Sequence, residues 1–192
     1  IALDEEFVAL SVLRDAYLGT LSDVYLISAP ASGIVPDRLF FAKSVHVYSG
    51  EEGRPRVVIP VFPGTNCEYD SAAAFRRAGG IPETVLIRNL TADDIESSIR
   101  QLTEAIGRSQ ILMIPGGFSG GDEPDGSGKF IMAVFRESRV SEAVQRLLDR
   151  DGLILGICNG FQALIKLGLV PYGEIRDMRS DSPTLTFNRI GR

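Results

Sequence analysis

One short stretch, Gly156-Ile157-Cys158-Asn159-Gly160, constrains the fold of this chain more than any other. It follows an apolar run at 153–155 that predicts a buried strand, and it precedes residues 161–168, whose pattern predicts a helix ending at a glycine. A cysteine between two glycines at a strand-to-helix turn is typical of a nucleophile elbow, because only small residues fit beside so tight a turn. The turn would place the Cys158 thiol over a sheet edge, at the positive end of a helix, which favours the reactive thiolate.

Strands and helices alternate from residue 56 onward. The sequence predicts strands at 56–62, 84–88, 110–114 and 153–157, and helices at 68–78, after a Thr91 cap, at 130–135, after a Ser141 cap and at 161–168. This alternation predicts an α/β fold with a mostly parallel sheet and helices on both faces. Sites in such sheets form at the carboxyl ends of the strands. Cys158 and the loops that begin at Pro63 and Pro115 should therefore share one edge.

The first quarter of the chain is predicted to be separate from this alternating region. Residues 49–55 are polar, rich in glycine and broken by a proline, so they predict a linker that divides the chain into 1–54 and 55–192. Residues 1–54 carry no recognisable chemistry and are expected to be a linker or a segment that packs on another domain. Within them the sequence predicts an amphipathic helix and two short strands, at 4–18, 24–27 and 39–41.

Composition and charge argue against several classes of partner. The net charge is −5 and the pI about 5.0, and no basic run occurs, so nucleic acid is not expected. No apolar run reaches the roughly 18 residues that span a membrane. Two cysteines and one histidine offer neither a disulfide framework nor the spacing of metal ligands, so no metal or other cofactor is expected in this chain, and the cytoplasm is the expected location.

The loop that begins at Pro115 is the second candidate element of a site. Its paired glycines, Gly116 and Gly117, follow a strand and can turn backbone N–H groups toward a neighbouring group, although such a loop can also be a plain surface loop. Beside a cysteine elbow it predicts an oxyanion hole, with the N–H of Asn159 as the second donor. Cys67 also begins a helix, but no glycines flank it as in an elbow, and a packing role is expected for it.

Three segments together resemble the class I glutamine amidotransferases. They are the elbow with the residues that follow it up to Gln162, the loop at 115–119, and the segment at 62–68. Within that family the resemblance is greatest to the glutaminase domains of phosphoribosylformylglycinamidine synthases, and it covers about residues 55–192. It implies a flavodoxin-like fold in which Cys158 attacks the side-chain amide of glutamine and forms a thioester. It also implies an oxyanion and substrate site formed by Gly116, Gly117, Phe118, Asn159 and Gln162.

The resemblance also implies partners. Ammonia released from glutamine would pass to a synthetase domain of the same enzyme, where ATP and magnesium drive the conversion of formylglycinamide ribonucleotide to formylglycinamidine ribonucleotide in purine biosynthesis. Residues 1–54 would then be the tail of that synthetase region, as in the large single-chain form of the enzyme. The family's His and Glu partners of the cysteine lie further downstream, so a chain that ends at Arg192 is expected to be C-terminally truncated and inactive alone.

Two alternatives remain open at this point. One is a DJ-1-like elbow protein, although that group usually has a histidine directly after the cysteine, where this chain has Asn159. The other is a non-catalytic binding module of the same fold. It is compatible with the lack of a nearby base, because the chain's single histidine, His46, precedes the whole predicted sheet.

Overall fold

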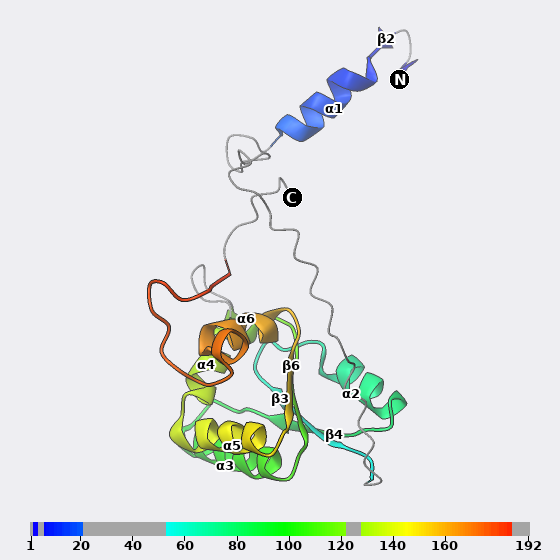
Figure 1. The fold of residues 1–192 in the computed structure, drawn as a ribbon. Coiled ribbons are helices and arrows are strands. Elements are labelled where there is room, and N and C mark those ends of the chain that lie inside the picture. The colour runs from blue at the N-terminus through cyan, green and yellow to red at the C-terminus, as the bar shows by residue number, and fades with distance from the viewer. Residues whose placement is uncertain (1, 4–5, 21–52, 122–127, 186–192) are drawn as a thin grey trace, which may run out of the picture. The chain divides into compact units, whose positions relative to one another are not determined.

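The computed structural model describes residues 2–3, 6–20, 53–121 and 128–185, and its elements belong to two units (Figure 1). In the first unit, β1 (Ala2–Leu3) pairs antiparallel with β2 (Glu6–Phe7), and α1 (Leu10–Gly19) has no buried residue. The helix predicted at 4–18 therefore begins later than expected, because the residues before it pair as strands and Ala9 is extended. The strands predicted at 24–27 and 39–41 lie outside the described residues.

The second unit is built on a four-stranded sheet whose strands are all parallel. The strand order is β4-β3-β5-β6, with bounds Ile81–Leu86, Arg56–Val61, Ile111–Ile114 and Leu153–Gly156. This confirms the predicted α/β fold with a parallel sheet. β4 begins before the predicted residue 84, and it includes Pro82, which a strand at the edge of a sheet tolerates because one of its sides is unpaired.

Helices connect the strands: α2 (Glu68–Arg77), α3 (Ala92–Gly107), α4 (Lys129–Phe135), α5 (Ser138–Asp149), α6 (Asn159–Leu167) and α7 (Leu169–Tyr172), with a 3-10 turn η1 (Ser119–Gly121) after β5. α3 begins as predicted, since Thr91 Oγ1 accepts a hydrogen bond of 3.1 Å from the Asp94 N–H. The predicted Ser141 cap is wrong. α5 begins earlier because the Glu137 carboxylate accepts a hydrogen bond of 3.2 Å from the Val140 N–H and caps the helix there.

Helices cover both faces of the sheet, as the sequence predicted. Successive strand residues point to opposite faces, so Val57 and Ile59 pack with Ala72 of α2 while Val58 packs in the larger core. That larger core joins the other face of the sheet to α3, α4, α5 and α6. Figure 1 shows α2 on one side of the strands, and α3 with α5 on the opposite side.

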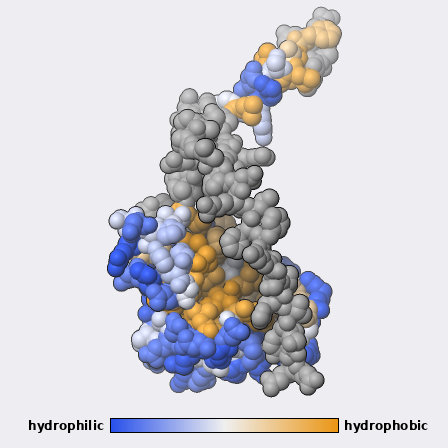
Figure 2. All heavy atoms as spheres, in the orientation of Figure 1, coloured by the Kyte–Doolittle hydropathy of each residue, from blue (hydrophilic) through white to orange (hydrophobic). Residues whose placement is uncertain are grey.

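The edge strand β6 and the residue that directly follows it expose three apolar side chains at alternate positions. Leu153, Leu155 and Ile157 have exposed fractions of 64%, 44% and 48%. Figure 2 shows apolar residues gathered on the side of the unit where β6 runs in Figure 1. In the part of the chain that the structure describes, no helix is both long and apolar enough to cross a membrane.

Candidate functional site

Cys158 stands at the turn between β6 and α6, and its backbone has the conformation of an elbow. Its φ is 51° and its ψ −111°, which makes it one of two non-glycine residues with positive φ in the described ranges. Such a conformation costs of order 1–3 kcal/mol and persists only where the surrounding structure enforces it. The residue is exposed. The predicted elbow is thus confirmed as a backbone feature.

The two glycines of the elbow are required by close packing. A Cβ on Gly160 would lie 2.1 Å from the carbonyl oxygen of Ile114, and one on Gly156 would lie 2.6 Å from Leu164 Cδ1. Neither position therefore has room for a side chain. This close approach lets α6 begin directly against the end of β5, and it fixes where the turn holds the Cys158 side chain.

The loop after β5 is held by the segment that follows β3. Gly117 forms an antiparallel bridge with Thr65, and the Phe118 N–H donates a 2.9 Å hydrogen bond to the Gly64 carbonyl oxygen. Backbone hydrogen bonds therefore join the loops that begin at Pro63 and Pro115, at the carboxyl ends of the neighbouring strands β3 and β5. This confirms that the two loops share one edge with the elbow.

Gly117 is placed to donate its backbone N–H. Its φ is 134°, and a Cβ there would lie 2.4 Å from the Gly64 carbonyl oxygen, so only glycine fits. In the bridge with Thr65 the Gly117 N–H points away from the 62–67 segment, because the flanking residues make the hydrogen bonds. Within the described residues the Gly117 N–H donates no hydrogen bond. It is a suitable donor for a developing oxyanion.

Asn159 links the loop to the elbow. It is 2% exposed, and its Oδ1 accepts a 2.7 Å hydrogen bond from the hydroxyl of Ser119, which is 3% exposed. Its Nδ2 donates to Gln162 Oε1 at 3.3 Å. The side chain of Asn159 thus holds the 115–119 loop against the elbow, a contact that we did not predict from the sequence.

The structure brings most of the predicted site residues together. Gly116 touches the elbow, since a Cβ on it would lie 3.2 Å from Cys158 Cβ, and Gln162 contacts Asn159. Phe118 is 65% exposed on the loop. The catalytic and binding roles of these residues stay predictions. The sequence reasoning missed Ser119, whose only signal was its place directly after the Gly-Gly-Phe of the loop.

Cys67 also lies at this edge. It is the N-cap of α2, it is half-buried, and its thiol donates a 3.1 Å hydrogen bond to Asn66 Oδ1. Its Sγ is 3.7 Å from the position that a Cβ on Gly116 would take. Cys67 and Cys158 therefore both adjoin Gly116, one on each of two neighbouring loops.

Comparison with protein families agrees with this geometry. Residues 54–192 match the family model of the CobB/CobQ-like glutamine amidotransferase domain. The chain belongs to this family. Membership confirms the predicted relation to the class I glutamine amidotransferases and argues against a DJ-1-like protein.

Several relatives of this amidotransferase domain are named "Phosphoribosylformylglycinamidine synthase subunit PurQ". The protein from Dehalococcoides mccartyi is 38% identical over 130 residues, which cover 68% of this chain and 46% of the relative. The protein from Sulfurimonas denitrificans is 40% identical over 60% of this chain and 44% of its own length. The protein from Treponema denticola is 34% identical over 72% and 50% respectively. This chain thus spans about half the length of these relatives.

A solved structure is also similar. It is described as "Structure of PurLQS from Thermotoga maritima", and it matches with a TM-score of 0.43 and 28% sequence identity over 60% of this chain and 45% of that chain.

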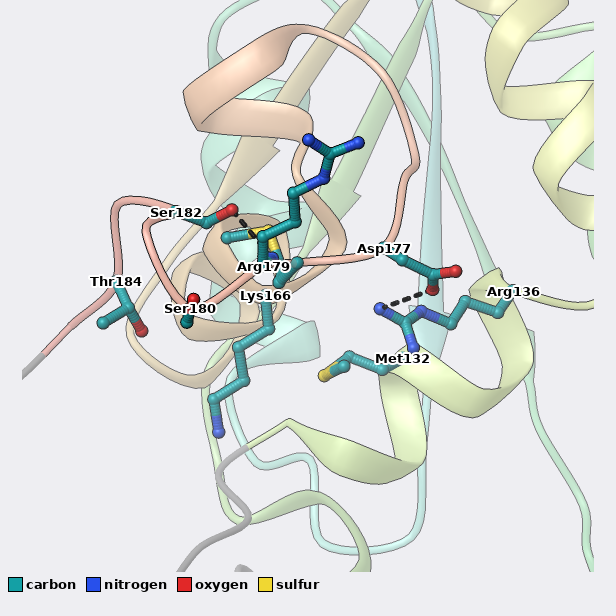
Figure 3. A pocket seen from close by; sticks show the side chains of 9 residues that line it. Met132, Arg136, Lys166, Asp177, Arg179, Ser180, Ser182 and Thr184 are labelled. Carbon is teal, nitrogen blue, oxygen red and sulfur yellow. Dashed lines mark hydrogen bonds and ion pairs between the residues drawn. The ribbon is translucent and has the colours of Figure 1, made fainter.

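A cavity of about 430 Å³ lies between α4, α6 and residues 177–184, and Cys158 is not among the residues that line it. Figure 3 shows the side chains of Lys166 and Arg179 extending in opposite directions from its wall. Arg136 pairs with the exposed Asp177 at 3.7 Å. Among the described residues, no group of three or more His, Cys, Asp or Glu is placed to hold a metal ion.

Proposed function

We propose that this amidotransferase domain is the glutaminase portion of a phosphoribosylformylglycinamidine synthase, and that it hydrolyses glutamine through a thioester on Cys158. The observation that carries the proposal is the exposed Cys158 at a positive-φ turn, directly beside the Gly116–Gly117 loop. The names of the relatives support the choice of enzyme.

In the first step the Cys158 thiolate attacks the side-chain amide carbon of glutamine. The carbonyl π electrons move to oxygen, and the backbone N–H groups of Gly117 and Asn159 stabilise the resulting oxyanion. The carbon–nitrogen bond then breaks, the nitrogen takes a proton from water, and ammonia departs and leaves a γ-glutamyl thioester on Cys158.

In the second step water attacks the thioester carbon through the same oxyanion. The carbon–sulfur bond breaks, and glutamate and the free thiol are released. Asn159 and Ser119 hold the loop in register with the elbow during both steps, so they are positioning residues. His46 lies outside the described residues and is assigned no role.

The ammonia is used elsewhere. The proposed acceptor is a synthetase that binds ATP and magnesium and converts formylglycinamide ribonucleotide to formylglycinamidine ribonucleotide in the cytoplasm. The family match begins at residue 54, and the proposal includes a large single-chain form in which the residues before it connect this domain to that synthetase. No residue of this chain is assigned to ATP or magnesium.

The test separates the supply of ammonia from its use. In the complete enzyme, Cys158→Ser should reduce glutamine-dependent product formation by at least about 10³-fold, because a serine hydroxyl is a much weaker acid than a thiol and attacks the amide poorly. High ammonium chloride should still support synthesis, since the synthetase needs only ammonia. Cys67→Ser serves as the matched control and should retain both activities.

Two outcomes would contradict the proposal. Retention of glutamine-dependent activity in Cys158→Ser would remove Cys158 as the nucleophile. Loss of both activities, with Cys67→Ser unaffected, would show that Cys158 supports the fold or the synthetase instead of the attack on glutamine.

A further inference from the structure

We propose that Cys67 and Cys158 form a reversible disulfide, which makes this edge of the sheet a site of thiol oxidation that switches the glutaminase off. The proposal rests on the proposed function, because it concerns the regulation of the same nucleophile. The pairing itself stands on geometry alone.

Gly116 separates the two cysteines. A Cβ on this glycine would lie 3.2 Å from Cys158 Cβ and 3.7 Å from Cys67 Sγ. Cys158 Cβ and Cys67 Sγ are therefore at most 6.9 Å apart, which is the sum of these two distances. Cys158 Sγ is bonded to the first of these two atoms, and the disulfide requires that rotation about χ1 of the two side chains bring the sulfurs together beside Gly116.

The lack of a side chain at Gly116 leaves space beside both cysteines, since a Cβ there would lie 3.2 Å from Cys158 Cβ, 3.5 Å from the Ile157 carbonyl oxygen and 3.7 Å from Cys67 Sγ. Gly116 is not among the glycines with positive φ, so its backbone conformation does not demand glycine. A side chain there would press on Cys158 Cβ and occupy the volume between the two cysteine side chains. The missing side chain thus keeps the path between the thiols open.

The two thiols differ in exposure as expected if Cys158 reacts first with the oxidant and Cys67 then attacks the oxidised sulfur to form the disulfide. Cys158 is exposed at the start of α6, whereas Cys67 is half-buried at the start of α2. Accessible thiols at helix N-termini with a second cysteine nearby are the ones that sense oxidants. The chain has two cysteines in all, so this is the only disulfide that can form within it.

The oxidant is a hydroperoxide. The Cys158 thiolate attacks one peroxide oxygen, the O–O bond breaks, and a sulfenic acid forms as hydroxide leaves. Cys67 sulfur then attacks the Cys158 sulfur, the S–O bond breaks, and water leaves with the Cys67 proton. Two thiols lose two electrons in total and hydrogen peroxide becomes two waters. A dithiol reverses the reaction by thiol–disulfide exchange and restores the nucleophile.

The experiment treats the complete reduced enzyme with stoichiometric hydrogen peroxide and then maps its peptides by mass spectrometry without reduction. We expect the peptides of Cys67 and Cys158 to be joined, with a mass about 2 Da below their sum. Glutamine-dependent activity should fall with the joined fraction and return with dithiothreitol, whereas ammonium-dependent activity should not change. The same comparison is made with a several-fold excess of peroxide, because sulfinic acid requires a second equivalent. In Cys67→Ser, the excess should drive Cys158 to sulfinic acid and dithiothreitol should no longer restore activity, whereas the disulfide of the wild type should remain reducible.

The pairing is overturned if Cys158 oxidises without joining Cys67, if neither cysteine oxidises, or if Cys67→Ser loses and regains activity as the wild type does. Failure of the proposed function has a different signature. The peptides would still be joined by peroxide, but joining them would leave glutamine-dependent activity unchanged.

Discussion

Both α6 and α2 begin with a cysteine at the N-cap position, but only the turn before α6 is an elbow. Cys158 and Cys67 are both N-caps, so the positive end of a helix acts on each thiol. Their backbones differ, with φ of 51° at Cys158 and −119° at Cys67. The helix field alone therefore does not distinguish the proposed nucleophile from its neighbour.

The residues around each cysteine make the difference. Two positions after Cys158 stands Gly160, which has no room for a Cβ, whereas two positions after Cys67 stands Tyr69, which is 80% exposed. α6 packs closely against the end of β5 at Gly160, and the residue that precedes the helix, Cys158, has a strained positive φ. α2 begins in relaxed backbone. The comparison teaches that close packing against the sheet, rather than helix polarity, creates the exposed position.

The largest expected effect comes from breaking that packing. Gly160→Ala should lower the free energy of unfolding by at least about 3 kcal/mol, because the new methyl group meets the Ile114 carbonyl at 2.1 Å and the backbone must shift. The matched change at α2, Tyr69→Ala, should stay within about 0.5 kcal/mol, since that ring is exposed. Urea unfolding of both variants measures the difference. Equal stability of the two would mean that the elbow is not held by packing.

A smaller effect is expected from loosening the loop. Ser119→Ala removes the buried hydroxyl that donates to Asn159 Oδ1, and it should cost about 1–3 kcal/mol of stability. In the complete enzyme it should lower kcat for glutamine more than it raises KM, because the oxyanion donor at Gly117 is displaced. Asn66→Ala, which removes the exposed acceptor of the Cys67 thiol, is the matched change at α2 and should alter neither quantity. An unchanged kcat in Ser119→Ala would contradict the positioning role.

Much of this arrangement could be predicted from the sequence. The alternation of apolar runs and helical patterns gave the parallel sheet, and the glycines around Cys158 indicated the turn. The carboxyl ends of parallel strands meet at one edge, so the grouping of the loops at Pro63 and Pro115 with the elbow followed.

Other features depend on contacts that no local pattern encodes. The hydrogen bond between Ser119 and Asn159 joins side chains far apart in the chain, and it exists only because the sheet brings their loops together. The start of α5 was misplaced because a carboxylate, Glu137, outcompetes the serine hydroxyl at 141 as the cap. The approach of Cys67 to Gly116 likewise requires β3 and β5 to be neighbours.

The smallest effect is expected far from both cysteines. Arg139 of α5 binds the Glu96 carboxylate of α3 at 2.6 and 2.8 Å and Glu137 at 2.8 Å. The hydrogen bonds from Arg139 lower the pKa of Glu96. At Glu137 burial acts in the opposite direction, but hydrogen bonds from Arg139 and from the Val140 N–H outweigh it, and the pKa falls.

A carboxylate with a lowered pKa in the folded state stabilises the fold above its unfolded pKa of about 4.3, and this contribution is lost as the pH falls through the lowered value. Arg139→Gln should therefore lower Tm by no more than about 2 °C at pH 7, since the pairs are on the surface. The difference from wild type should shrink as the pH falls below 4.3. Thermal melts between pH 3 and pH 7 check this, and the reactivity of neither cysteine should change. A difference that grows on acidification would contradict the linkage.

The most direct test of the central claim compares the two thiols in one molecule. The reduced protein is treated with limiting iodoacetamide, and the labelled fraction of each cysteine is followed by peptide mass mapping. Cys158 should react about tenfold faster than Cys67, because its thiol is exposed on the elbow while the Cys67 thiol is half-buried and hydrogen-bonded to Asn66. Equal rates, or faster labelling of Cys67, would contradict the account that the packed turn at α6 creates the reactive cysteine.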